Sequence, residues 1–281
     1  MFWTDACRGL PYRTKWHRKC IIVDGHTAII GGSNLLAVPL STDMDALVQG
    51  ECAQELQAEF CKAWRQMTDW PISAPTPCAG LAPPEGFDFA PWTASGVEAS
   101  VLASTVGASG SDPVLVHALR LIAGARKTVR IAMGFSAFTA PVIDAVAAAI
   151  ERGVSFSFVG NSYTSMDLKG PQLDQARSIV ALLTRCPAAE VWLTHGDRFL
   201  HGKYVVADGE AALFGSWNMW PRSHFYEHEL DLCVWDATIA RELEARFEAV
   251  REEFCNRAHD AASVAVGVGC PISCTWGLPL W

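Results

Sequence analysis

Lysine is scarce in this sequence, and basic residues as a whole are outnumbered. The 281 residues hold 22 lysines and arginines, six of them lysines, against 30 aspartates and glutamates, so the net charge is −8. A long polyanion needs many phosphate-neutralising side chains, so a general basic binding surface is excluded, although a local basic patch is not. The chain is 50% hydrophobic and 19% charged, which also excludes a disordered or collagen-like chain.

The cysteines show no CxxC pair. Ten cysteines are scattered along the chain, several of them inside apolar stretches. A chain of this length does not need a disulfide scaffold, so we expect free, buried thiols in a reducing compartment.

No targeting or membrane-spanning segment is evident. The N-terminal residues carry charges throughout and lack the apolar core of a signal peptide. No apolar run reaches 18 residues without interruption; residues 261–281 are uncharged but are broken by glycines and prolines. We therefore expect this tail to pack on the body or lie at a membrane interface, and the protein to be cytoplasmic or peripheral at a membrane.

What the chain does have is a proline-rich segment followed by alternating helix and strand patterns. Six prolines fall between positions 71 and 91, which predicts a linker over residues 71–112. Beyond it, the apolar spacing predicts helices over 113–125, 141–152 and 173–184, and strands over 128–133, 154–159 and 191–193. This alternation predicts an α/β fold in which helices cover a largely buried mixed sheet.

The chain also repeats itself at an offset of 184 residues. WHRKCIIVDGHTAIIGGSN in the first part matches LHGKYVVADGEAALFGSWN in the second, with HxKxxxxD in each copy. Composition alone predicts roughly 0.01 occurrences of that pattern in a chain of this size, so two copies in register indicate a true repeat. The matching pairs are His17 and His201, Lys19 and Lys203, Asp24 and Asp208, and Asn34 and Asn218, and an acidic residue follows each Asn by eleven positions, at Asp45 and Glu229.

Each copy is expected to form a β-hairpin, because Asp-Gly between apolar runs favours a tight turn. Residues two apart in a strand share a face, so each His projects with its Lys. Asp24 and Asp208 fall at the turn, which suggests a structural role. A two-residue turn would place Gly32 opposite His17 and Ser216 opposite His201, which leaves room for a ligand beside each imidazole.

Two such hairpins, packed with pseudo-two-fold symmetry, would gather two His, two Lys and two Asn around one point. The lysines and the amides of Asn34 and Asn218 suit a phosphate group. Two imidazoles suit a two-step displacement at phosphorus, in which one attacks and the other protonates the leaving alcohol and deprotonates the acceptor. Asp45 and Glu229 are the candidates to hold the second nitrogen of each imidazole.

These motifs resemble the twin HxKxxxxD motifs of the phospholipase D superfamily, with the nearest likeness to bacterial cardiolipin synthase-like members. HRKCIIVDG…GGSN, HGKYVVADG…GSWN and the later segment PRSHFYEHEL carry the likeness. The resemblance implies two phospholipase D-like lobes and a metal-independent and cofactor-independent attack on a phosphodiester through a phosphohistidine. It further implies that His17 is the nucleophile and His201 the general acid and base, although the order could be reversed.

The sequence departs from the family pattern in composition near the site and in length. Family members often have Asn where this chain has Glu227, and His228 replaces an apolar residue. About 88 residues from position 113 precede His201, whereas 16 precede His17, so we expect a truncated first lobe. The expected division is residues 1–70 for the first lobe, 71–112 for the linker, 113–260 for the second lobe and 261–281 for the tail.

Three functions remain open at this point. The first is phospholipid transphosphatidylation of the cardiolipin synthase type, or phospholipase D hydrolysis, with a phosphatidylglycerol-type lipid and a membrane surface as partners. The second is a nuclease of the same superfamily, ranked lower because of the net charge. The third is an inactive, truncated remnant. His224 and His228 stand four apart but lack HExxH order, so no metal site is expected there.

Overall fold

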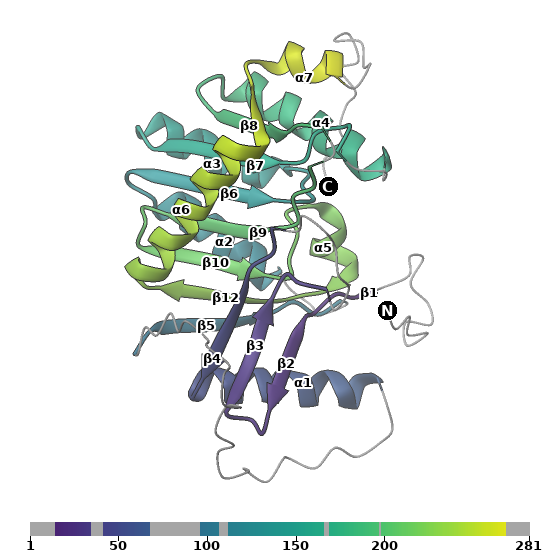
Figure 1. The fold of residues 1–281 in the computed structure, drawn as a ribbon, viewed down its shortest axis with the longest axis vertical. Coiled ribbons are helices and arrows are strands. Elements are labelled where there is room, and N and C mark those ends of the chain that lie inside the picture. The colour runs from purple at the N-terminus through teal and green to yellow at the C-terminus, as the bar shows by residue number, and fades with distance from the viewer. Residues whose placement is uncertain are drawn as a thin grey trace.

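The computed structural model describes residues 15–34, 42–67, 96–106, 112–165, 169–196 and 198–267. These residues form a mixed α/β structure with a large lobe and a small one (Figure 1). The expected proline-rich stretch from 71 to 91 and the tail beyond residue 267 lie outside the described residues. No helix in the described part of the chain is long and apolar enough to span a bilayer.

The large lobe is built on an eight-stranded mixed sheet. Its spatial order is β13-β8-β7-β6-β9-β10-β12-β5, with β6, β7 and β8 parallel and the other neighbours antiparallel. The strands are β5 (Glu98–Ala103), β6 (Thr128–Met133), β7 (Ser155–Gly160), β8 (Glu190–Thr194), β9 (Lys203–Ala207), β10 (Ala211–Gly215), β12 (Leu230–Trp235) and β13 (Cys255–Ala258). All five residues of β9 and all five of β10 are buried, because helices cover both faces of the sheet.

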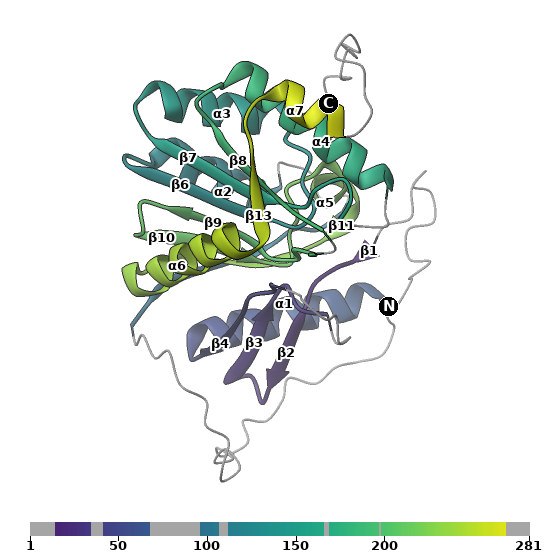
Figure 2. The same ribbon diagram turned by 45° about the horizontal axis from the view of Figure 1, so that its top comes forward.

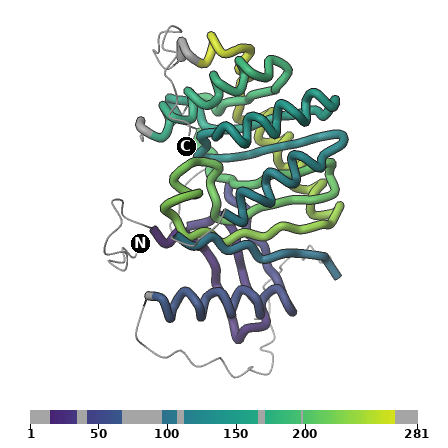
Figure 3. The backbone as a smooth tube through the Cα atoms, turned by 180° about the vertical axis from the view of Figure 1, so that it is seen from behind, coloured from purple at the N-terminus to yellow at the C-terminus, as the bar shows by residue number. Residues whose placement is uncertain are grey.

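Helices lie on both faces of this sheet. α6 (Ala237–Phe254) crosses the near face in Figure 1, while α2 (Pro113–Gly124), α3 (Ala140–Glu151) and α4 (Lys169–Arg185) lie on the far face, as the view from behind in Figure 3 shows. α7 (Ala261–Gly267) packs beside α4 (Figure 2). The three helices and three strands predicted between residues 113 and 193 correspond to α2, α3 and α4 and to β6, β7 and β8, to within four residues at their ends.

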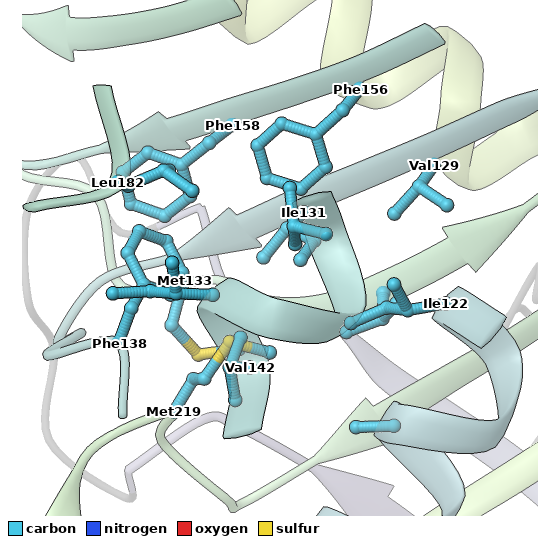
Figure 4. Packing of buried hydrophobic residues seen from close by; sticks show 14 of the residues in the cluster. Ile122, Val129, Ile131, Met133, Phe138, Val142, Phe156, Phe158, Leu182 and Met219 are labelled. Carbon is cyan, nitrogen blue, oxygen red and sulfur yellow. The ribbon is translucent and has the colours of Figure 1, made fainter. Parts of the chain in front are cut away.

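The core on the far face is apolar and closely interdigitated. Phe138 and Phe158 meet edge to face with ring centroids 4.9 Å apart, and Ile131, Met133 and Phe156 line the sheet beneath the helices (Figure 4). Burial of such side chains stabilises the fold by about 1.5–3 kcal/mol each. This core supports the strands that end at the candidate site.

The small lobe is a three-stranded antiparallel sheet, β2-β3-β4, covered on one face by α1 (Glu51–Met67). Its strands are β2 (Cys20–Val23), β3 (Thr27–Gly31) and β4 (Asp45–Gln49). They correspond to β9, β10 and β12, and α1 corresponds to α6. In Figure 1, α6 lies on the near side of its sheet, whereas α1 lies on the far side of its own, and Figure 3 shows the same arrangement from behind.

The lobes are joined by a short parallel pair of strands. β1 (Lys15–Trp16) pairs with β11 (Glu227–His228), and the amide of His17 donates to the carbonyl of His228 at 3.0 Å. The short helix α5 (Pro221–Tyr226) leads directly into β11. This pairing brings the residues before His17 against those before Glu229.

One expected boundary needs correction. Residues 98–103, placed in the linker over 71–112 by the sequence, form β5 and pair with β12 along its length. The strand was missed because its sequence, EASVLA, has weak strand propensity and follows a proline-rich segment.

Candidate active site

Both repeat motifs fold into hairpins with the expected Asp-Gly turn, but the register differs by one residue. Asp24 and Gly25 have φ of 55° and 68°, and Asp208 and Gly209 have 58° and 62°, the positive values that a type I′ turn requires. Val23 then pairs with Thr27, so His26 is an extra residue beside the turn. The expected positions of Gly32 opposite His17 and Ser216 opposite His201 are therefore wrong, because the sequence gives no sign of this bulge.

The two turn aspartates lie away from the histidines, at the far ends of the hairpins. The Asp208 carboxylate accepts backbone N–H bonds from residues 126, 127 and 128 at 2.7–3.1 Å, and these bonds lower its pKa against the effect of burial. Asp208 thus fixes the start of β6, which agrees with a structural role.

His17 is held by a carboxylate from the other lobe. Its Nδ1 lies 2.9 Å and 3.1 Å from the two carboxylate oxygens of Glu229. Burial, together with the charge of Lys19, places the pKa of His17 well below its usual value. A neutral imidazole whose Nδ1–H points at Glu229 leaves Nε2 unprotonated, which is the form that can attack phosphorus.

Glu229 is fully buried and held by two hydroxyl groups. Ser216 donates to one of its oxygens at 2.6 Å and Ser223 to the other at 2.7 Å. Burial raises the pKa of Glu229 to about 7, and the two hydroxyl bonds oppose that rise. The hydroxyls therefore help to keep ionised the group that orients His17.

His201 has the reciprocal arrangement, with Asp43 from the small lobe. Nδ1 of His201 lies 2.6 Å from Oδ1 of Asp43, and the N–H groups of His201 and Gly202 both donate to Oγ1 of Thr42. Burial lowers the pKa of His201, while the hydrogen bond to Asp43 raises it. Each lobe thus supplies the carboxylate for the histidine of the other.

The expectation that Asp45 would hold an imidazole is wrong. Asp45 accepts from the backbone N–H of Ser33 at 3.2 Å and from its hydroxyl. Its counterpart is Asp231, which accepts from the N–H of Trp217 at 3.2 Å. The loop between the Asn and the acidic residue is two residues shorter in the first copy, so Asp43 rather than Asp45 corresponds to Glu229.

The glycines that open these loops confirm this correspondence. A Cβ on Gly31 would lie 2.6 Å from Cα of Asp45, and a Cβ on Gly215 would lie 2.6 Å from Cα of Asp231. Both sites need a glycine because the following strand approaches so closely. Sequence reasoning could have found Asp43 from the matched D-x-D at 43–45 and E-x-D at 229–231.

The two lysines project beside their histidines, as expected from their spacing. Lys19 donates to the carbonyl of His17 at 2.7 Å, and Lys203 donates to the carbonyl of His201 at 2.6 Å. Burial lowers the pKa of Lys19 to about 8 and that of Lys203 to about 7. A bound phosphate would restore their charge, because an adjacent anion favours the protonated ammonium.

The four residues expected to bind phosphate differ in what they contact. The hydroxyl of Ser216 donates its hydrogen bond to Glu229, so it positions that carboxylate and is not free to donate to a phosphate. Gly32 lies against Asp43, where a Cβ would be 2.8 Å from Oδ1. Asn218 is buried and its Oδ1 has no hydrogen-bond partner in the described part of the chain, whereas Asn34 is exposed. Phosphate contact by Asn34 and Asn218 stays a prediction.

A second carboxylate lies beside His17. Glu227 is buried and lies 3.0 Å from Nε of Arg222, 4.0 Å from Nζ of Lys15 and 3.0 Å from the hydroxyl oxygen of Ser223. His17, Glu227 and Glu229 each offer a ligand atom, all within 4.8 Å of one another, so these three could hold a metal ion. A metal there would have to displace the hydroxyl contacts of Glu229 and the guanidinium contact of Glu227.

The remaining residues singled out in the sequence are structural neighbours of the site. His228 stacks on Trp16 with ring centroids 4.0 Å apart, and burial lowers its pKa to about 4. His224 lies 3.3 Å from the carboxylate of Asp112. His201 borders the rings of Phe135 and Phe199, with centroids 6.2 Å and 5.7 Å away.

Comparison with known proteins agrees with this geometry. Residues 118–251 match the family described as cardiolipin synthase, PLD-like domain. Cardiolipin synthase A of Pectobacterium carotovorum subsp. carotovorum is 26% identical over 254 residues, which are 86% of this chain and 48% of that protein. The probable cardiolipin synthase YwiE of Bacillus subtilis is 26% identical over 245 residues, 84% of this chain and 46% of that protein. The chain spans about half the length of these curated relatives.

A solved structure shows the same fold. The phosphatidylserine synthase of Haemophilus influenzae Rd KW20 superposes with a TM-score of 0.65 at 16% identity, over 88% of this chain and 64% of that one. The family match, the curated relatives and the twin motifs point to one superfamily. The chain is therefore similar to proteins of the phospholipase D superfamily, with cardiolipin synthases among its relatives.

Proposed function

We propose that this chain is a phosphatidyl-transferring enzyme that acts on phospholipids through a phosphohistidine. The observation that carries the proposal is the crossed pair of histidines and carboxylates, His17 with Glu229 and His201 with Asp43. Two imidazoles, each oriented by its own carboxylate, are what a two-step displacement requires. The relatives named as cardiolipin synthases favour a phospholipid as the substrate.

In the first step Nε2 of one histidine attacks phosphorus, and the bond from phosphorus to the leaving alcohol breaks. The other histidine gives its proton to that alcohol oxygen. By the family resemblance His17 attacks and His201 is the acid, and the lowered pKa of His17 agrees with this order. Lys19 and Lys203 neutralise charge on the non-bridging oxygens.

In the second step the same acid becomes a base. His201 takes the proton of an acceptor hydroxyl while that oxygen attacks phosphorus, and the bond from phosphorus to His17 breaks. A second phosphatidylglycerol as acceptor gives cardiolipin and water gives phosphatidic acid. No metal enters either step, since both proton transfers use imidazole. We also propose that the protein works at a membrane surface, where such lipids are found.

The test uses the purified full chain with vesicles of phosphatidylglycerol. Transfer predicts cardiolipin and free glycerol; hydrolysis predicts phosphatidic acid and glycerol. Samples denatured rapidly near neutral pH should carry a phosphatidyl group on one histidine by peptide mass spectrometry, and the variants His17→Asn and His201→Asn should form no product. Turnover of an oligonucleotide with no lipid product would instead indicate a nuclease, and no turnover of either substrate by a folded chain would indicate an inactive remnant.

A further inference from the structure

The outer face of the small sheet is apolar and uncovered by any described element. Ile21, Val23 and Leu47 are 48%, 49% and 49% exposed. Ile21 pairs with Ile29, and Ile29 pairs with Leu47, so three large aliphatic side chains form a row across all three strands. α1 covers the opposite face: it lies behind these strands in Figure 1 and in front of them in Figure 3. Large apolar patches of this kind mark binding surfaces.

The second copy of the motif shows what covers such a face. The positions that correspond to this face are at most 6% exposed; they are Val205, Ala207, Leu213 and Cys233. They belong to the same buried cluster as Val114, Ala118 and Ile122, the fully buried residues of α2. The face is therefore closed by one helix that presents a small or β-branched apolar residue at every fourth position.

The matching strands of the two sheets also differ in whether their outer edges are paired with another strand. β9, the counterpart of β2, pairs antiparallel with β6, and β12, the counterpart of β4, pairs antiparallel with β5. Among the described strands, β2 and β4 pair only with β3. Both outer edges of the small sheet thus keep backbone groups ready to accept another strand.

From these matched faces and edges we propose that the outer face of the small sheet is a docking surface for a polypeptide partner with strand–helix–strand organisation. The partner's helix lies on Ile21, Ile29 and Leu47 as α2 lies on its own sheet. Its two strands run antiparallel to β2 and β4, as β6 and β5 run to β9 and β12. This inference stands apart from the proposed substrate, because it concerns the surface opposite α1.

Docking would also act on the active site. β2 follows directly on His17 and Lys19, and β4 begins two residues after Asp43. A partner that pairs with both strands would hold the nucleophile segment and the carboxylate of His201 in place. We therefore expect the bound partner to raise turnover by tenfold or more while leaving the chemical outcome unchanged.

The experiment places a photo-crosslinking amino acid at position 47 of the full chain, expressed in its native cell. A matched control carries it at Gln54, an exposed position on α1. The proposal expects a polypeptide adduct at position 47 and none at 54. Peptide mapping should place the adduct on a helix with apolar residues four apart and a strand on either side. The amides of β2 and β4 should then exchange more slowly in the complex than in the free chain.

Two variants keep the test falsifiable. Leu47→Lys should reduce the adduct from a crosslinker at position 29 at least tenfold, whereas Gln54→Lys should not, and both variants should melt like the parent chain because both positions are exposed. Adducts only to another copy of this chain or only to lipid, or no adduct at all, would each overturn the proposal. Loss of lipid turnover with docking intact would refute the proposed function and leave the docking surface standing.

Discussion

Asp43 of the small lobe lies 2.6 Å from Nδ1 of His201 in the large lobe. The reciprocal contact joins Glu229 of the large lobe to His17 of the small one at 2.9 Å. Each imidazole is therefore oriented only when the two lobes are together, so the site is a property of the interface between the lobes and not of either motif alone.

The first prediction separates Asp43 from its neighbour Asp45. Asp43→Asn removes the charge that stabilises the protonated imidazole of His201, so we expect kcat to fall by about 10²–10⁴-fold, as for other oriented histidines. Asp45→Asn weakens only contacts within the Gly31–Ser33 loop and should lower kcat less than tenfold. Steady-state assays on phosphatidylglycerol vesicles measure both. Equal losses in the two variants, with equal melting temperatures, would contradict the assignment of Asp43.

The second prediction concerns the hydroxyls on Glu229. Ser216→Ala removes a bond that lowers the pKa of Glu229, so that pKa should rise above its present value of about 7. Activity needs the ionised carboxylate, so the acid limb of the pH–kcat profile should move to higher pH and much of the loss should be recovered above pH 8. Ser223→Ala should shift the limb in the same direction. A uniform loss at every pH would mean that the serine serves only packing.

The sequence predicted the histidines and lysines of the site correctly, but it did not predict which carboxylate contacts His201. The spacing of His17 and Lys19, and its repetition at His201 and Lys203, requires no knowledge of loop length, because both members of each pair lie in one short segment. Asp43 was missed because a fixed offset of 184 does not survive a loop that is two residues shorter; 43 and 229 differ by 186. The spacing of residues within one short motif is therefore the same in both copies, whereas the difference in residue number between the copies changes wherever a loop differs in length.

Two other features could not be read from the sequence for physical reasons. The parallel pairing of Lys15 with Glu227 joins residues 212 apart, and a two-residue strand has no periodicity to reveal it. The uncovered face of the small sheet has the same apolar alternation as the covered face in the large lobe. Strand pattern therefore predicts that a face will be buried, but not what buries it.

The third prediction is that replacing Lys203 removes activity but stabilises the fold. This lysine is fully buried, and burial lowers its pKa from 10.5 to about 7. Lys203→Met should abolish turnover and raise the free energy of unfolding at pH 6 by about 1–4 kcal/mol, the gain seen when buried ionic groups become apolar. Denaturant unfolding, followed by tryptophan fluorescence, measures the gain.

The pH dependence of that gain has a definite sign. Between about pH 7 and 10.5 the unfolded lysine binds a proton that the folded one has released, so the parent chain gains stability as pH rises. The advantage of Lys203→Met should therefore be greatest below pH 7 and shrink toward pH 10. An advantage that grows with pH would show that the folded lysine keeps its proton.

The last prediction uses Glu227, the additional carboxylate beside His17. Its charge is offset by Arg222 at 3.0 Å and Lys15 at 4.0 Å, so Glu227→Gln would leave two cations without their partner at the site. We expect the KM for anionic phosphatidylglycerol to fall about three- to tenfold at low salt, and the gain to vanish near 0.5 M salt, where charges are screened within a few ångströms. Phosphatidylcholine, whose headgroup has no net charge, serves as the matched substrate and should show little change. An equal fall in KM for both lipids would mean that the substitution reshapes the site and does not alter its charge, and the role of Glu227 in opposing anionic headgroups would then be wrong.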